Sequence, residues 1–218
     1  MSRIARGALC SGLLLAVAAC GSGEDKEKSE EPVVVDTSEF DQAPIPDGIS
    51  SLLEEDFPEE LKPGNGASLT DKMTWNAVEA VAQIGGKVDP DTEGQCPEIE
   101  GRTGETATCT VRYFGEEFEY RLEVTSGEGV LIQSTGTVAP LPLTRETVAD
   151  HFRFQTTFEH VTCDMDDLVV AEEGVETGVV CRAWSPEHSA LTTADVVASQ
   201  SGPEFPNIET EYNAVEKG

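Results

Sequence analysis

Residues 104–124, with the sequence GETATCTVRYFGEEFEYRLEV, decide the fold. In the first half of the stretch, Cys109, Val111 and Tyr113 alternate with polar residues, and Gly115 and Glu116 then favour a turn. In the second half the alternating apolar residues are Phe118, Tyr120, Leu122 and Val124. A period of two is typical of strands that bury one face and expose the other. The stretch therefore predicts two neighbouring antiparallel strands.

The residues on either side of this stretch extend the pattern. Residues 69–84 predict a helix that begins with a near capping box at Ser68 and Asp71 and ends at Gly85 and Gly86. Its apolar residues fall on one face of the helix: Leu69, Met73, Ala77, Val81 and Ile84. A third strand is expected over residues 130–138. Residues 67–139 thus predict a module made of one helix and a small antiparallel sheet.

The same order of features returns after the linker at residues 139–142. A helix is expected from Leu143, carrying Val148 and Phe152, and strands are expected near residues 191–198 and 208–215. The predicted fold class is therefore α+β, with two tandem repeats, each an N-terminal helix packed on a small antiparallel sheet with one disulfide. The second repeat is assigned to residues 140–218.

Four cysteines follow Cys20, and four cysteines allow three pairings. The repeat selects Cys96 with Cys109 and Cys163 with Cys181. Outside the cytoplasm an even set of cysteines favours disulfides, and closing a loop of about 15 residues contributes about 3 kcal/mol to stability. A redox or metal site is the alternative, but there is no Cys-x-x-Cys pair, and the spacings are wider than those of zinc sites.

A set of these features resembles a family of short domains found in actinobacterial lipoproteins. The set comprises Cys96-Pro97, Gly104, Cys109-Thr110-Val111 and the alternating strand after Gly115. The resemblance covers residues 69–138, and the second repeat matches less well because Asp164, rather than proline, follows Cys163. It implies a helix followed by an antiparallel sheet pinned by a disulfide at its start. Because the family has no known function, the resemblance implies no activity.

The N-terminal sequence predicts a lipoprotein precursor. Residues 1–19 have the layout of a secretory signal, with Arg3 and Arg6 before an apolar run too short to span a bilayer. Small residues then lead into Cys20, as in the bacterial lipobox, so Cys20 is the expected site of lipidation. The alternative is an ordinary signal peptide followed by an incidental cysteine. Lipidation would hold the protein at the extracytoplasmic face of the cell membrane.

Residues 20–66 are expected to form an acidic, disordered tether. Residues 21–66 contain 14 acidic residues and three lysines, and low hydrophobicity with high net charge disfavours folding. Without residues 1–19, the chain keeps 12 basic and 42 acidic residues, a net charge of −30. Such a charge disfavours binding to nucleic acid, which requires clustered lysine and arginine.

One acidic stretch has the spacing of a calcium-binding EF-hand loop. Its oxygen-bearing residues are Asp89, Asp91, Glu93 and Glu100, and Gly94 occupies the turn position. Three features disfavour calcium: Glu93 stands where Asp or Asn is usual, Cys96 is assigned to a disulfide, and no helix is expected after Gly101. A solvated loop is therefore expected both here and at the acidic residues Asp164, Asp166 and Asp167, and divalent cation binding is the alternative.

No motif in the sequence predicts catalysis. The histidines, His151, His160 and His188, lack metal-ligand spacing, and Trp75 and Trp184 favour packing roles. No catalytic residue, metal ligand or cofactor is predicted. The expected function is non-catalytic binding of a protein or another envelope component, through the sheets or the cleft between the modules. The alternatives are an enzyme with an acidic cleft, a modulator of an envelope enzyme, and a structural spacer or envelope sensor.

Overall fold

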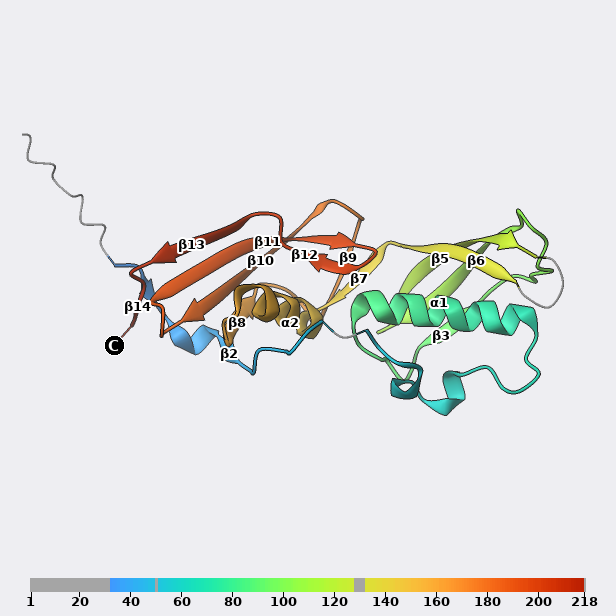
Figure 1. Ribbon diagram of the computed structural model, residues 1–218, viewed down its shortest axis with the longest axis horizontal. Coiled ribbons are helices and arrows are strands. Elements are labelled where there is room, and N and C mark those ends of the chain that lie inside the picture. The colour runs from blue at the N-terminus through green and yellow to red at the C-terminus, as the bar shows by residue number, and fades with distance from the viewer. Residues whose placement is uncertain (1–31, 50, 128–131, 218) are drawn as a thin grey trace, which may run out of the picture. The chain divides into compact units, whose positions relative to one another are not determined.

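The computed structural model describes residues 32–49, 51–127 and 132–217. The first half of this range contains a four-stranded antiparallel sheet in the order β3-β4-β5-β6, with helix α1 on one face (Figure 1). The elements of this half are α1 (Leu69–Gly85), β3 (Glu93–Gln95), β4 (Thr106–Tyr113), β5 (Glu116–Ser126) and β6 (Gln133–Ala139). The other face of the sheet carries polar side chains and is open to solvent.

The predicted alternation is confirmed in β4 and β5. Cys109 pairs with Tyr120 and Val111 with Phe118, and all four side chains are buried. The predicted helix is confirmed over Leu69–Gly85, where the Ser68 and Asp71 side chains form a complete capping box. The helix is capped by Gly86, whose φ of 68° lies in the left-handed region that glycine adopts most readily because it has no Cβ atom.

The second half has a different strand arrangement. A six-stranded sheet runs in the order β12-β11-β10-β8-β2, with β13 paired beside β12 along β11, and β7 and β9 form a separate two-stranded sheet. The bounds are β7 (Leu141–Thr144), α2 (Arg145–Thr156), β8 (His160–Cys163), β9 (Leu168–Ala171), β10 (Glu176–Ser185), β11 (Ala190–Ser199), β12 (Gly202–Glu204), β13 (Ile208–Tyr212) and β14 (Val215–Glu216). Helix α2 packs on β8 and β10.

Both predicted disulfides are present. Cys96 is bonded to Cys109, and Cys163 is bonded to Cys181. The second bond joins residues that face each other across the β8–β10 pair. The first bond joins β4 to the residue directly after β3, and the second joins β8 to β10.

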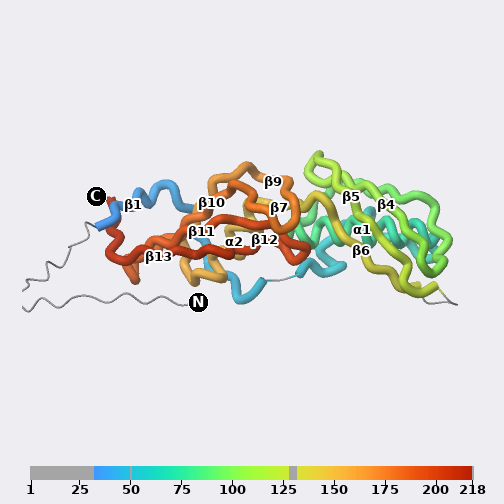
Figure 2. The backbone as a smooth tube through the Cα atoms, turned by 90° about the horizontal axis from the view of Figure 1, so that it is seen from above, coloured from blue at the N-terminus to red at the C-terminus, as the bar shows by residue number. Residues whose placement is uncertain are grey.

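Residues 32–66 depart from the expected tether. They contribute β1 (Val34–Val35), β2 (Asp41–Gln42) and the 3-10 turns Thr37–Glu39, Glu54–Asp56 and Glu59–Leu61. Strand β1 pairs with β14, and β2 pairs with β8. Figure 2 shows β1 beside the C-terminal end of the chain. We call residues 32–66 the strap.

Apolar side chains explain why the strap is ordered. Phe57 is buried against the ring of Trp75 on α1, and Val35 forms a small second core with Trp184 and Ala214. The prediction of disorder averaged the charge of the whole segment and overlooked these scattered apolar residues, so it is wrong for the described part of the strap. The remaining tether residues, 20–31, lie outside the described residues.

The predicted fold class is also wrong. The protein is mostly β, with 42% strand and 21% helix, and its described residues contain two α-helices and several sheets. They do not form two repeats that each place an N-terminal helix on one sheet, because the strap adds strands to the second half and β7 and β9 form a sheet of their own. One continuous core also includes residues from both halves, such as Val81 and Val148. Among the described residues, no helix has the length and hydropathy needed to cross a membrane.

Candidate functional site

The candidate site is a pocket of about 700 Å³ where the two halves of the fold meet, here called the junction pocket. Side chains from the strap, the end of α1, the β4–β5 turn, α2 and β9 surround it. Its lining residues are Asp41, Lys87, Phe114, Thr144, Arg145, Glu146, Ala149, Arg153, Asp167 and Leu168. Three of these residues are basic in a chain that has only 14 basic residues.

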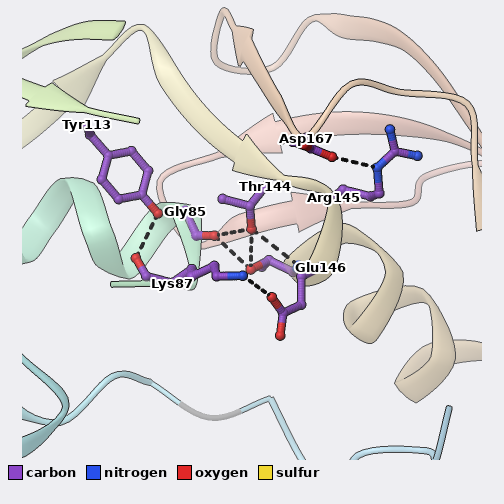
Figure 3. Close-up of polar contacts among 8 residues, drawn as sticks. Gly85, Lys87, Tyr113, Thr144, Arg145, Glu146 and Asp167 are labelled. Atoms are coloured by element: carbon purple, nitrogen blue, oxygen red, sulfur yellow. Dashed lines mark hydrogen bonds and ion pairs between the residues drawn. The ribbon is translucent and has the colours of Figure 1, made fainter. Parts of the chain in front are cut away.

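The end of α1 and the start of α2 are joined by buried hydrogen bonds beside the pocket (Figure 3). The hydroxyls of Thr144 and Thr147 both donate to the carbonyl oxygen of Gly85, each at 2.7 Å. A Cβ atom at Gly85 would overlap the ring of Tyr113, and one at Gly86 would overlap Thr147. The two glycines therefore allow the halves to approach closely enough to bury these bonds.

Lys87 is held at the pocket from both of its ends. The Tyr113 hydroxyl donates to the Lys87 carbonyl oxygen at 2.7 Å, and the Lys87 ammonium pairs with the Glu146 carboxylate at 2.5 Å (Figure 3). Burial, and then the negative charge of Asp89, raise the pKa of Tyr113, so its hydroxyl stays protonated and remains a donor. Lys87 follows the negative end of the α1 dipole, and Glu146 lies at the positive end of α2, which favours both charges.

Phe114 is positioned by Asp89, the first residue of the loop with EF-hand-like spacing. The Asp89 carboxylate accepts the backbone N–H of Asp91 at 3.0 Å through one oxygen and that of Phe114 at 2.6 Å through the other. Phe114 has a φ of 49°, and its ring packs edge-on against Tyr113. Its side chain nevertheless stays 43% exposed at the pocket. An exposed aromatic ring held in an uncommon backbone conformation is typical of functional positions.

Arg145 and Arg153 have different roles in the pocket wall. The Arg153 side chain is buried and donates to the Asp150 carboxylate and to the backbone carbonyl oxygens of Asp41 and Glu159. Arg153 therefore fastens the strap to α2. The Arg145 guanidinium is 45% exposed, and its contact with the fully exposed Asp167 carboxylate is long, at 3.4 Å. An exposed ion pair of this kind contributes about 0–1 kcal/mol, so its partner is easily replaced.

The residues proposed for calcium do not gather around an ion site. Both Asp89 oxygens are used by backbone N–H groups, and the Glu100 carboxylate pairs with Arg102. Among the described residues, no group of three or more histidine, cysteine or acidic side chains has the geometry of a metal site. Cys20, the predicted lipidation site, lies outside the described residues.

The histidines and tryptophans lie away from the junction pocket. His151 is partly buried in α2 near Gly202, and burial is the main cause that lowers its pKa. His160 faces Trp184 across the β8–β10 pair, and the ring of His188 lies 6.1 Å from that of Phe158. Trp75 packs against Phe57. These residues support the fold and do not share one site.

A second, acidic hollow of about 610 Å³ is lined in part by residues 138–141, which link the two halves. Four of its lining residues are glutamates, two from β5 and two from the β9–β10 connection: Glu117, Glu119, Glu172 and Glu173. Glu173 accepts a hydrogen bond from Gln200, and the same Gln200 side chain pairs with the backbone of Val138. The hollow is thus part of the contact between the halves.

Sequence reasoning missed the residues that characterise the junction pocket. Lys87, Phe114 and Arg145 carry no motif, and they come from segments up to 58 residues apart. A possible signal was the aromatic residue placed directly before Gly115 in a turn, where exposed polar residues are usual. The pocket combines an aromatic surface with hydrogen-bonding cations, which are the parts of a recognition site. No known protein family, curated protein or solved structure matches this chain.

Proposed function

We propose that this protein is a lipoprotein of the bacterial cell surface that binds an envelope component, without catalysis, in the junction pocket. The observation that carries the proposal is the convergence of Phe114, Lys87 and Arg145 on one pocket from three separate segments. The pocket volume falls within the range of small-ligand sites. Its ion pairs are exposed and exchangeable, while its frame of buried hydrogen bonds is fixed. A preformed frame with exchangeable charges favours ligand binding.

The proposed anchor is Cys20, with the mature protein on the extracytoplasmic face. The two disulfides support an oxidising location. Because the strap is folded, only residues 20–31 separate Cys20 from the domain, and 12 residues span at most about 40 Å whatever their conformation. The protein would then work close to the membrane, beginning at β1.

Site-specific photo-cross-linking in intact cells tests this proposal. A photoreactive amino acid would replace Phe114 in the pocket, and a matched control would carry it at Thr137, on the open face of the first sheet. We expect one adduct of reproducible mass from position 114 that is absent at position 137. It should decrease when Cys20→Ala releases the protein from the membrane. Adducts from position 137 alone would instead place binding on the open sheet face.

A further inference from the structure

We infer that the junction pocket recognises the free C-terminal carboxylate of a short peptide whose last side chain is apolar. The inference rests on the proposed function and names its ligand class. Its basis is the pairing of an exchangeable guanidinium at Arg145 with an exposed ring at Phe114 in the same pocket. A ligand that satisfies both must carry an anionic group beside an apolar one.

Arg145 is the group best suited to receive the carboxylate. A guanidinium binds a carboxylate through two parallel N–H bonds. The Arg145 guanidinium makes only long contacts, at 3.4 Å to the Asp167 carboxylate and 3.5 Å to the carbonyl oxygen of Cys163. The Asp167 side chain is fully exposed, so a ligand carboxylate can take its place while Asp167 turns to solvent. In contrast, Arg153 is buried and fully engaged with the strap and α2.

The balance of charge in the pocket favours a carboxylate over a phosphate. The three basic lining residues, Lys87, Arg145 and Arg153, are matched by three acidic ones, Asp41, Glu146 and Asp167. Because the pocket has no net charge and the protein is strongly acidic, a doubly charged phosphate would be repelled more strongly than a singly charged carboxylate. Glu146 is itself 64% exposed and can accept an N–H group from the peptide backbone next to the carboxylate.

Phe114 provides the surface for the terminal apolar side chain. Its position is fixed by the Asp89 carboxylate and the Tyr113 ring, so the exposed ring face needs no reordering when a ligand binds. A pocket of about 700 Å³ has room for two or three peptide residues.

Calorimetry with matched peptides tests the inference on the full chain purified in detergent. The probes are acetyl-Gly-Gly-Leu with a free carboxylate, the same peptide as its C-terminal amide, and inorganic phosphate. We expect the free acid to bind at least tenfold more tightly than the amide and phosphate. Arg145→Gln and Phe114→Asn should each weaken binding of the acid about tenfold or more, and asparagine tolerates the positive φ at position 114. The control Arg121→Gln, on the open sheet face, should bind normally.

Equal binding of acid and amide, or absence of binding by both, would overturn the carboxylate assignment. Tighter binding of phosphate would replace it with a phosphate group. These results concern the ligand class alone, because the cross-link from position 114 in cells tests whether the pocket binds anything. Thermal unfolding of each variant shows whether weaker binding comes from a lost ligand contact or from a lost fold. The comparison of the acid with the amide uses the unsubstituted protein and does not depend on any variant.

Discussion

The carboxylate of Asp89 accepts the backbone N–H of Phe114 at 2.6 Å, linking the loop after α1 to the β4–β5 turn. Asp89 is 7% exposed, so its two hydrogen bonds replace those it would make with water. A residue that the sequence suggested for calcium therefore holds an aromatic side chain at the candidate site.

Replacing Asp89 should destabilise the protein. In Asp89→Ala the N–H groups of Phe114 and Asp91 lose their acceptor, and we expect the free energy of unfolding to fall by about 1–3 kcal/mol. Urea unfolding measures the change. Asp91→Ala is the control, because only the backbone of Asp91 takes part, and it should stay within about 0.5 kcal/mol of the wild type. Calcium-dependent stabilisation lost in Asp89→Ala would instead support the metal hypothesis.

The contact between Gly86 and Thr147 should make Gly86 more sensitive to substitution than Gly104, which has open space around it. Gly86→Ala suffers both a positive φ and an overlap with Thr147, whereas Gly104→Ala has a positive φ of 83° but open space around it. The positive φ alone should lower the free energy of unfolding by about 1 kcal/mol in each variant. The overlap with Thr147 should lower it by about 1–3 kcal/mol more in Gly86→Ala. Thermal unfolding of both variants compares them. Equal losses would show that the two halves do not pack tightly here.

The strap should contribute to stability through its buried aromatic residue. Phe57→Ala removes a side chain that is 3% exposed and packs on Trp75, and we expect a loss of about 3–5 kcal/mol in the free energy of unfolding. Leu53→Ala, at a side chain in the same segment that is 57% exposed, should change it by less than about 0.5 kcal/mol. Two equally small changes in urea unfolding would restore the prediction of a disordered tether.

Acid should weaken the contact between β1 and the C-terminal strand. Hydrogen bonds from Ser38, followed by the bond to and charge of Lys217, lower the pKa of Asp36 from 3.8 to about 2. Because the folded-state pKa lies below the unfolded value, the stabilisation is fully present above about pH 4 and is lost as the pH falls toward 2. An NMR titration of the Asp36 carboxyl measures its pKa, and amide hydrogen exchange at Val215 measures how readily β14 separates from β1. Asp36→Asn should remove this pH dependence, while Asp47→Asn should retain it.

Each disulfide should stabilise its own sheet independently. Replacing Cys96 and Cys109 by alanine, or Cys163 and Cys181, removes bonds with sequence separations of 13 and 18 residues. The chain-entropy model predicts that each replacement lowers the free energy of unfolding by about 3 kcal/mol. Chemical denaturation measures this change. The two losses should add in the quadruple variant, because the bonds lie in different sheets. Clear non-additivity would show that the two bonds are coupled through the core that both halves share.

The sequence by itself determined the local features of this protein. Alternation along residues 104–124 predicted β4 and β5, because side chains of a strand point to opposite faces in turn. The apolar stripe and caps predicted α1, and the repeated order of features around the cysteines predicted both disulfides. The strand and helix signals act within about 20 residues, which is the range over which spacing reports geometry.

Only the tertiary structure decided how distant segments combine. It placed Val35 beside Ala214 and Phe57 beside Trp75, which turned a segment with the composition of a tether into part of the fold. It also brought Lys87, Phe114 and Arg145 to one pocket. The physical reason is that order and binding depend on partners contributed from elsewhere in the chain. A local charge average records the cost of ordering a segment but omits the apolar contacts that offset it.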